Sequence, residues 1–340
     1  MKNCKKVASQ GLEAVDRREK RKERVLKPAA FSFNLIDYSL LSKKGMPMEK
    51  AVRFYSETVP MAGVLFLPEG LTTGEKRPGV VMCHGFTAVK EVLFPEIARR
   101  MATLGYVTLT FDYRFLGASG GEPRRQIIPM RQIEDIRNAV TFLQNQVAVD
   151  PERIGLLGVS LGGANVSYAA GVEERVKATV SVCGIGDCGR WIRDACHFWE
   201  WKALLQRLAE DRRERVLTGK LQYVDAKDLV PEPETTTVLF AQLLQQYPQW
   251  SREITLASGE ALIAYRPELV VEKISPRAIM WLHGDADERV SMEESVAMFK
   301  SAHEPKKLVI LSGLGHSDII SGPGLDQSLP HIKEWFAKYL

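Results

Sequence analysis

The chain has 340 residues, 45% of them hydrophobic, which is enough to bury a large core as one domain with an insertion or a small cap. Its formal net charge of +4 does not favour a nucleic-acid partner, and no apolar run is long enough to cross a membrane. The N-terminus is basic and polar rather than a signal sequence, and five cysteines in a long chain are typical of reduced thiols, so we expect a cytoplasmic protein.

Residues 1–50 contain a charged segment, Asp16 to Arg24, that mixes both signs and is rich in good helix formers. We predict an N-terminal helical extension over 1–50. It is either a solvated helix or an arm that contacts a partner or forms a homodimer.

From residue 51 short apolar runs alternate with helical patterns, which predicts a mostly parallel sheet with right-handed crossovers. Strands are expected at 52–55, 63–67, 79–83, 106–111, 154–157, 177–183, 277–282 and 308–311, the first two as an antiparallel pair. Helices are expected at 94–104, 130–146, 161–170, 292–301 and 329–339. The core domain would comprise residues 51–187 and 271–340.

The strand rhythm stops over residues 188–270, which contain no convincing core strand and read as mostly helical. We predict a helical cap over the C-terminal edge of the sheet, the edge where such sheets bind ligands. The aromatic residues of this segment are expected both to pack and to line an apolar substrate pocket. The candidates for the pocket are Trp191, Phe198, Trp199 and Trp201.

The stretch 154–164 predicts a buried strand, a tight turn and the start of a helix. Gly158 and Gly162 bracket Ser160 in the pattern G-x-S-x-G. An abrupt strand-to-helix turn crowds the positions two before and two after its apex, where only very small side chains fit. Ser160 is therefore the predicted nucleophile, presented at the C-terminal edge of the sheet.

A serine hydroxyl becomes a nucleophile when a histidine takes its proton and a carboxylate orients that histidine. His316 follows the strand at 308–311 in a glycine-containing loop that can bring its ring to Ser160. His84 and His283 each precede a glycine and are expected to pack locally. The other histidines fall in the insertion or on surface helices: His197, His303 and His331.

Asp287 is the first choice for the carboxylate, because it follows the strand at 277–282 and precedes the histidine in the chain. Asp187 is the next candidate, since it follows an earlier strand from which it could also reach the ring. Asp285 and Asp318 are weaker alternatives, the latter because it is too close to the histidine in sequence.

The backbone N–H groups of Leu161 and Phe86 are the predicted oxyanion hole, one directly after the nucleophile and one after the strand at 79–83. Asp112 and Arg114 are expected to pin loops rather than to react. No metal is predicted, because the spacing of the nearest candidate ligands matches no standard zinc pattern. Those candidates are Cys183, Cys188, Cys196 and His197. No cofactor is expected either.

The motifs taken together resemble the α/β-hydrolase superfamily, in particular its dienelactone-hydrolase-like and Xaa-Pro-dipeptidyl-peptidase-like branch. The resemblance covers about residues 51–340 and rests on His84-Gly85-Phe86, Asp112-Tyr113-Arg114, Gly158-Val159-Ser160-Leu161-Gly162, His283-Gly284-x-x-Asp287 and Gly315-His316. It implies an α/β fold with an eight-stranded, mostly parallel sheet and a Ser160, Asp287, His316 triad. Dienelactone hydrolases proper use cysteine as the nucleophile, so lactone specificity does not carry over.

We therefore hypothesise a serine hydrolase that cleaves an acyl bond, first of all a carboxylic ester, of a small and partly apolar substrate. An amidase or peptidase, an acyltransferase or thioester hydrolase, and a carbon–carbon bond hydrolase would use the same triad and stay open. A non-catalytic binding protein on the same fold is disfavoured, because all three candidate triad residues are present.

Overall fold

A computed structural model describes residues 47–340, so the predicted helix at Asp16 to Arg24 lies outside the described residues. The main sheet has eight strands in the order β1-β2-β4-β3-β5-β6-β9-β10. They are β1 (Met48–Ser56), β2 (Val59–Leu67), β3 (Arg77–Cys83), β4 (Val107–Phe111), β5 (Val149–Val159), β6 (Val176–Val182), β9 (Ala278–Gly284) and β10 (Lys306–Leu311).

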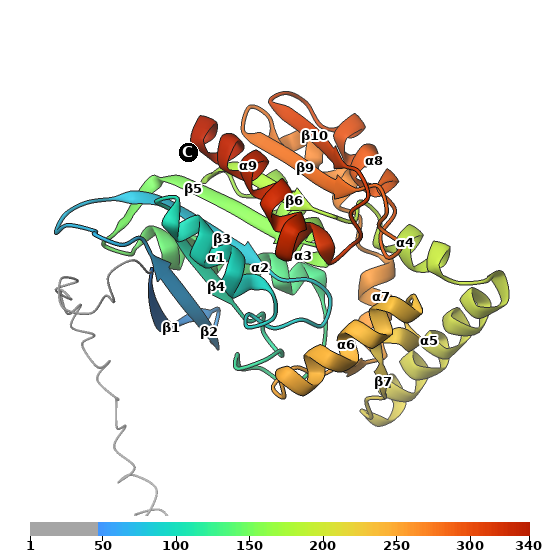
Figure 1. Cartoon of the computed structure of the whole chain (residues 1–340). Helices are drawn as coiled ribbons and strands as arrows, with labels where there is room; N and C mark the ends of the chain where they lie inside the picture. Colours follow the sequence, from blue (N-terminus) through green and yellow to red (C-terminus); the bar gives the residue numbers. More distant parts are fainter. Residues whose placement is uncertain (1–46) are drawn as a thin grey trace, which may run out of the picture. The chain divides into compact units, whose positions relative to one another are not determined.

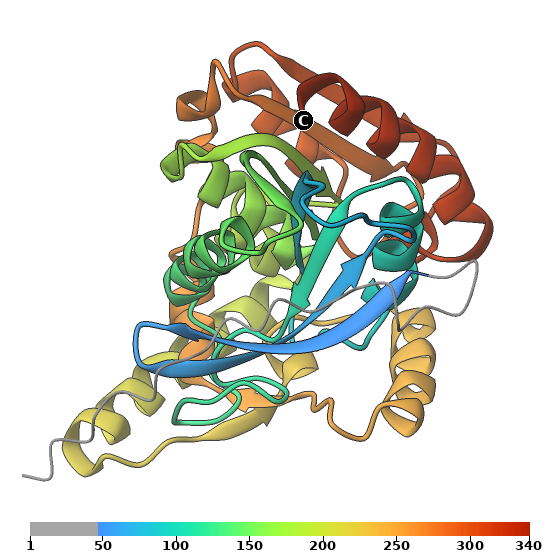
Figure 2. The same cartoon turned by 90° about the vertical axis from the view of Figure 1, so that its left-hand side faces the viewer.

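Neighbouring strands of this sheet are parallel except for the pairs β1–β2 and β2–β4, which are antiparallel. The predicted eight-stranded, mostly parallel sheet and its antiparallel opening pair are therefore confirmed. Figure 2 shows the β1–β2 hairpin, in blue, at the edge of the sheet.

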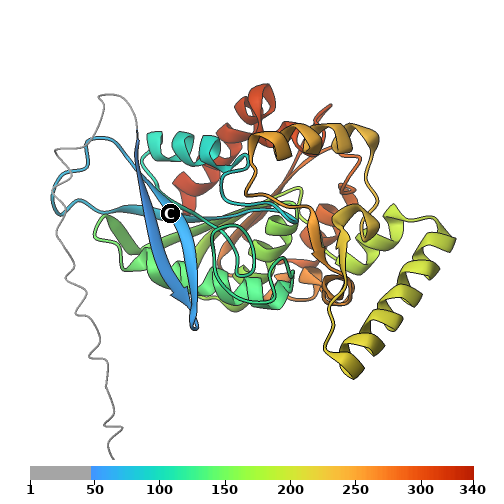
Figure 3. The same ribbon diagram turned by 90° about the horizontal axis from the view of Figure 1, so that it is seen from below.

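Helices cover both faces of the sheet (Figures 1 and 3). On one face lie α1 (Phe94–Thr103) and α9 (Gly322–Tyr339), and on the other lie α2 (Pro129–Gln144), α3 (Leu161–Val172) and α8 (Glu293–Ser301). Strand β9 shows why its sequence is apolar throughout. Met280 and Leu282 pack in the cluster with α1 and α9, while Ile279 and Trp281 pack on the opposite face against α8. Successive side chains of a strand face opposite sides, so a strand covered on both faces needs no polar alternation.

Two element boundaries differ from the prediction. Strand β1 begins at Met48, so the predicted boundary at residue 50 cuts through it. Helix α9 begins at Gly322, seven positions before the predicted start. Gly322, Pro323 and Gly324 look like a loop in the sequence, but proline is well tolerated in the first turn of a helix, where its missing N–H would have no partner.

The segment 188–270 contributes no strand to the main sheet. It contains α4 (Cys188–Ala195), α5 (Phe198–Thr218), α6 (Glu234–Gln246) and α7 (Ala257–Ile263), with short 3-10 turns between them. The short strands β7 (Tyr223–Asp225) and β8 (Glu253–Thr255) form a separate antiparallel pair, which the sequence analysis missed. None of the helices within residues 47–340 combines the length and apolar character needed to cross a membrane.

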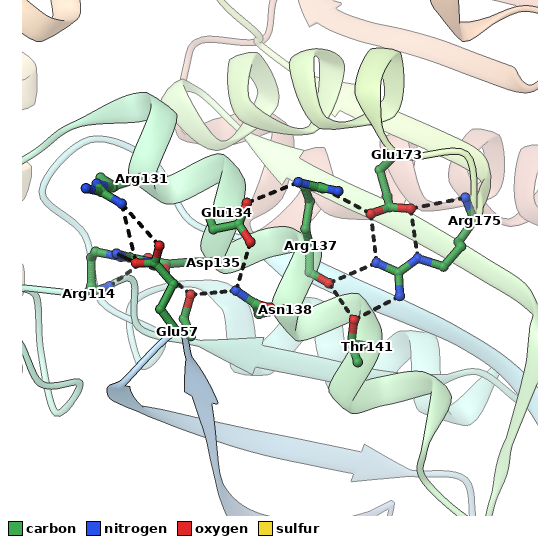
Figure 4. Close-up of polar contacts among 11 residues, drawn as sticks. Glu57, Arg114, Arg131, Glu134, Asp135, Arg137, Asn138, Thr141, Glu173 and Arg175 are labelled. Atoms are coloured by element: carbon green, nitrogen blue, oxygen red, sulfur yellow. Dashed lines mark hydrogen bonds and ion pairs between the residues drawn. The ribbon is translucent and has the colours of Figure 1, made fainter.

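Asp112 and Arg114, just after β4, hold loops in place as predicted. The Arg114 side chain is 4% exposed, and its guanidinium donates to Asp135 on α2 (Nε to Oδ1, 2.8 Å) and to Glu57 of the β1–β2 turn (Nη1 to Oε2, 2.7 Å), as Figure 4 shows. The Asp112 carboxylate accepts from both the backbone N–H and the Nζ of Lys90, each at 2.8 Å. These buried charges are fully engaged in positioning the loops at the end of β4.

Candidate active site

Ser160 sits at the apex between β5 and α3, with φ 61° and ψ −123°. A positive φ is unusual for a serine and marks a strained turn. Gly158 and Gly162 explain how the turn closes: a Cβ at 158 would run into the backbone of Gly162, and a Cβ at 162 would run into the carbonyl of Cys83. The predicted strand–turn–helix around Ser160 is confirmed, and its hydroxyl-bearing side chain stands where β5 ends.

Replacing Gly162 with alanine should destabilise the protein strongly. The new Cβ would overlap the backbone carbonyl oxygens of Cys83 and His84, and backbone cannot yield as a flexible side chain can. We expect the free energy of unfolding to fall by about 3 kcal/mol. Urea unfolding measures it, with Val172→Ala at the exposed end of the same helix as a control that should change stability by only about 0.5 kcal/mol. A loss below about 1 kcal/mol would show that the turn can open.

The backbone N–H groups of Phe86 and Leu161 both lie close to the serine. Leu161 is the first residue of α3, directly after Ser160, and Phe86 lines the same cavity as Ser160. Gly85 brings the second loop close, since a Cβ at that position would stand 3.1 Å from the Cβ of Ser160. Neither N–H donates a hydrogen bond within residues 47–340. Two unpaired donors beside a nucleophile are what an oxyanion hole requires.

Asp287 and His316 are brought together by the loops after β9 and β10. Nδ1 of His316 donates to Oδ2 of Asp287 at 2.7 Å. The other carboxylate oxygen, Oδ1, accepts the backbone N–H groups of Arg289 at 2.9 Å and Val290 at 2.8 Å. These bonds fix the carboxylate, which in turn fixes the ring and leaves Nε2 as the nitrogen that can take a proton.

His283, at the end of β9, also contacts this carboxylate. Its Nε2 lies 3.2 Å from Oδ2 of Asp287, and its Nδ1 lies 2.8 Å from the hydroxyl of Ser295. Burial opposes the charge on Asp287, but the hydrogen bonds from His283 and His316 outweigh it and hold the pKa of Asp287 well below its usual range. Burial lowers the pKa of His316, and the neighbouring Asp287 opposes part of that change.

The other three carboxylates considered in the sequence have different partners. Asp187 caps α4 by accepting the backbone N–H of Arg190 at 2.9 Å. Asp285 accepts the backbone N–H of Gly313 at 2.6 Å, and Asp318 accepts that of Gly315 at 3.0 Å. The last two carboxylates therefore shape the loop that carries His316, and neither orients its ring.

Ser160 and His316 line one cavity of about 60 Å³. No hydrogen bond joins the two side chains, and catalytic hydrogen bonds of this kind are often formed only once substrate is bound. Ser160 is 6% exposed, so the cavity shields the hydroxyl from bulk water. The cavity thus brings together the Ser160 side chain, the His316 ring and Phe86, and Leu161 directly follows Ser160 at the start of α3.

None of the four aromatic residues predicted for the substrate pocket lines this cavity, and their role in binding stays a prediction. Phe198 and Trp199 are 70% and 67% exposed on α5. Trp191 is buried, donating from Nε1 to the carbonyl of Arg289 at 2.8 Å, and lines a separate hollow of about 610 Å³. Trp201 lines a third hollow beside α4.

The insertion residues that do line the cavity come from later in the chain. They are Phe240 and Leu243 on α6, and Trp250 before β8. Trp250 donates from Nε1 to the hydroxyl of Thr87 at 3.3 Å and packs on Val92, which ties the insertion to the loop after β3. The many aromatic residues of the insertion indicated that some of them would line a pocket, but the sequence did not show that Phe240 and Trp250 would do so.

Cys183, His283 and Asp287 place one potential metal-ligand atom each within 4.8 Å of one another. Burial raises the pKa of the Cys183 thiol well above its usual range, with the Asp287 charge adding to the effect, and a metal ligand must be the thiolate. Oδ2 of Asp287 is already held by two histidines. The cluster therefore suits a buried hydrogen-bonded core better than a metal centre.

Comparisons with known proteins identify the family to which this fold belongs. Residues 80–324 match a family model described as alpha/beta hydrolase family. Thiohydrolase aneE of Aspergillus aculeatus is 48% identical over 123 residues, which cover 36% of this chain and 37% of that protein. Polyketide transferase af380 of Aspergillus fumigatus is 28% identical over 289 residues, covering 83% of this chain and 97% of that protein. The crystal structure of the hypothetical protein PA2218 from Pseudomonas aeruginosa has a TM-score of 0.76 at 26% identity and covers 88% of this chain and 96% of that one. The chain belongs to the alpha/beta hydrolase family.

Proposed function

We propose that the protein is a serine hydrolase that cleaves a carboxylic ester through an acyl-enzyme on Ser160. The observation that carries the proposal is that the strained Ser160, His316 and Phe86 line one cavity, with the His316 ring held by Asp287. The N–H groups of Phe86 and of Leu161, which directly follows Ser160, make no hydrogen bond within residues 47–340. A structural turn has no need of an adjacent histidine held by a buried carboxylate.

The mechanism follows from these positions. Nε2 of His316 takes the Ser160 proton as the oxygen attacks the ester carbonyl, and Asp287 stabilises the resulting imidazolium. The N–H groups of Phe86 and Leu161 hold the oxyanion of the tetrahedral intermediate. His316 then protonates the leaving alcohol, and water, activated by the same ring, releases the acid and regenerates Ser160.

Covalent labelling tests the identity of the nucleophile. A fluorophosphonate probe reacts with a serine only where a base and an oxyanion site activate it. We expect one label per chain, on the peptide that contains Ser160, located by mass spectrometry. Prior denaturation should abolish labelling, and a label found on another serine of the folded protein would refute the assignment.

The pH dependence should report the state of His316. The ring must be neutral to accept a proton, and burial lowers its pKa below the ordinary value of about 6.5. We expect kcat/KM for a neutral ester to be constant above pH 7 and to fall with a midpoint below about pH 6.5. Arg289→Met should raise that midpoint, because the Arg289 charge opposes protonation of His316. A midpoint above about pH 7.5 in the unaltered protein would contradict this environment.

Thioester hydrolysis or acyl transfer is the second candidate. It is supported by the relatives, since one is a thiohydrolase and another a polyketide transferase. The apolar cover formed by Phe240, Leu243 and Trp250 also supports it, because it limits access of water to the acyl-enzyme. Matched p-nitrophenyl esters, acyl thioesters and aminoacyl nitroanilides, assayed with and without an added alcohol or thiol, would separate ester hydrolysis from thioester hydrolysis, transfer and peptidase activity.

A further inference from the structure

Arg289 is a buried positive charge at the wall of the candidate active site. It follows Asp287 by two positions, its side chain is 7% exposed, and it lines the cavity that Ser160 and His316 also line. The mechanism above assigns no role to its guanidinium. A charged group is rarely buried beside an apolar cavity unless something pairs with it.

Most of the hydrogen-bonding capacity of Arg289 is unused. A guanidinium carries five N–H donors. Within residues 47–340 the group makes one hydrogen bond, from Nη1 to Oε2 of Glu232 at 3.2 Å, and its Cζ lies 4.9 Å from the centre of the Phe240 ring. Nε and Nη2 have no partner and are not sealed off from solvent. They are free to donate to a ligand.

The charge balance around Arg289 favours an anionic ligand. The buried Glu232 carboxylate is shared with a second buried guanidinium, that of Arg252, at 2.6 Å. Arg252 has a further partner in the half-exposed Asp225, whereas Arg289 has no second carboxylate partner among the residues that the structure describes. The Asp287 carboxylate is nearby, but its oxygens are occupied by His316, His283 and two backbone N–H groups.

The two hollows that Arg289 borders are not equivalent. The larger one, of about 610 Å³, is also lined by the carboxylates of Asp285, Glu288 and Glu293, which would repel an anion. The cavity that Ser160 lines has no carboxylate among its described lining residues. This cavity, at about 60 Å³, is the smaller of the two. Because Arg289 and Ser160 both line it, an anion bound there by Arg289 would lie close to the scissile carbonyl.

We propose that Arg289 binds a carboxylate on the acyl part of the substrate, so that the enzyme prefers half-esters of short dicarboxylic acids to neutral esters of the same length. This inference rests on the proposed function of Ser160. A planar carboxylate accepts two parallel N–H bonds from a guanidinium, which suits the unpaired Nε and Nη2.

The test compares p-nitrophenyl glutarate half-ester with p-nitrophenyl valerate, after subtraction of the spontaneous rates. The two acyl chains have equal length and differ in a terminal carboxylate. We expect Arg289→Met to lower the ratio of their kcat/KM values by about tenfold or more, because a hydrogen-bonded charge pair is lost. Arg252→Met is the matched control, because it removes the other guanidinium that pairs with Glu232. Arg252 does not line the cavity, so the ratio should stay within about twofold of its value in the unaltered protein.

An equal loss of kcat/KM for both esters in the Arg289→Met variant would overturn the inference. It would show that Arg289 acts on folding or on the protonation of His316, and not on the substrate carboxylate. Arg289→Gln is the second variant if the methionine variant does not fold. It keeps a polar side chain but no charge, and the same loss of the ratio is expected.

Binding separates this inference from the proposed function. Calorimetry on the Ser160→Ala protein would compare glutaranilic acid with valeranilide, the matching uncleaved amides. If the Ser160→Ala protein hydrolysed esters as fast as the unaltered protein, the proposed function would fail. Preferential binding of glutaranilic acid that depends on Arg289 would still support the anion site. If hydrolysis depends on Ser160 but the binding preference does not depend on Arg289, the inference alone fails.

Discussion

Ser160→Ala should lower kcat for ester hydrolysis by at least about ten-thousand-fold. Without the hydroxyl no acyl-enzyme forms, and His316 and the two N–H groups can only assist direct attack by water. The variant should still fold, since alanine differs only by one oxygen atom at a site where Ser160 makes no side-chain hydrogen bond to the described part of the chain. Steady-state kinetics with a p-nitrophenyl ester measure the loss, and thermal unfolding checks the fold.

Ser275→Ala is the matched control, because its hydroxyl bonds the carbonyl of Glu304 and it lies outside the Ser160 cavity. Its kcat should change by less than about twofold. If Ser160→Ala retained most of the turnover while it lost the phosphonate label, the serine would be reactive but not the nucleophile of the reaction.

Much of the fold was predictable because it rests on local patterns. Short apolar runs mark strands that are covered on both faces, and the glycines at 158 and 162 leave room for only one kind of turn around Ser160. The start of α9 was less predictable, since glycine and proline serve equally in loops and in the first turn of a helix.

The carboxylate partner of His316 could be ranked but not settled from the sequence. Asp187, Asp285 and Asp287 all follow strands that end at the same edge of the sheet. The choice depends on which nearby groups hydrogen-bond to each carboxylate. Asp285 accepts the backbone N–H of Gly313, and Asp187 accepts a backbone N–H in the first turn of α4. Such short-range competition has no signature in residue spacing.

The lining of the cavity was the least predictable part. Trp191 and Trp199 are nearer in sequence to the sheet than Trp250, yet Trp250 reaches the cavity and Trp199 faces solvent. An insertion folds back on the sheet by contacts between distant segments, such as Trp250 with Thr87, and periodicity along the chain does not report them. Arg289 was missed for a related reason, since a lone arginine in a loop usually points to solvent.

Asp287→Asn should lower kcat by about ten-thousand-fold while leaving the fold largely intact. The asparagine amide can keep an oxygen toward the backbone N–H groups of Arg289 and Val290. It then turns its NH₂ toward His316, and two donors cannot pair, so the ring must adopt the other tautomer. That tautomer carries its proton on Nε2 and cannot accept one from Ser160.

The control for this loss of base function is Asp187→Asn, since Asp187 is the runner-up carboxylate from the sequence. An asparagine there can still cap α4 through its side-chain oxygen, so kcat should change by less than about threefold. A pH profile adds a signature that simple unfolding would not produce. Without the Asp287 charge, which favours the protonated ring, the pKa of His316 should fall further, so the small remaining activity should extend to lower pH. If Asp187→Asn lowered kcat more than Asp287→Asn does, Asp287 would not be the carboxylate that orients the base. The hydrogen bond between Asp287 and His316 would then have only a structural role.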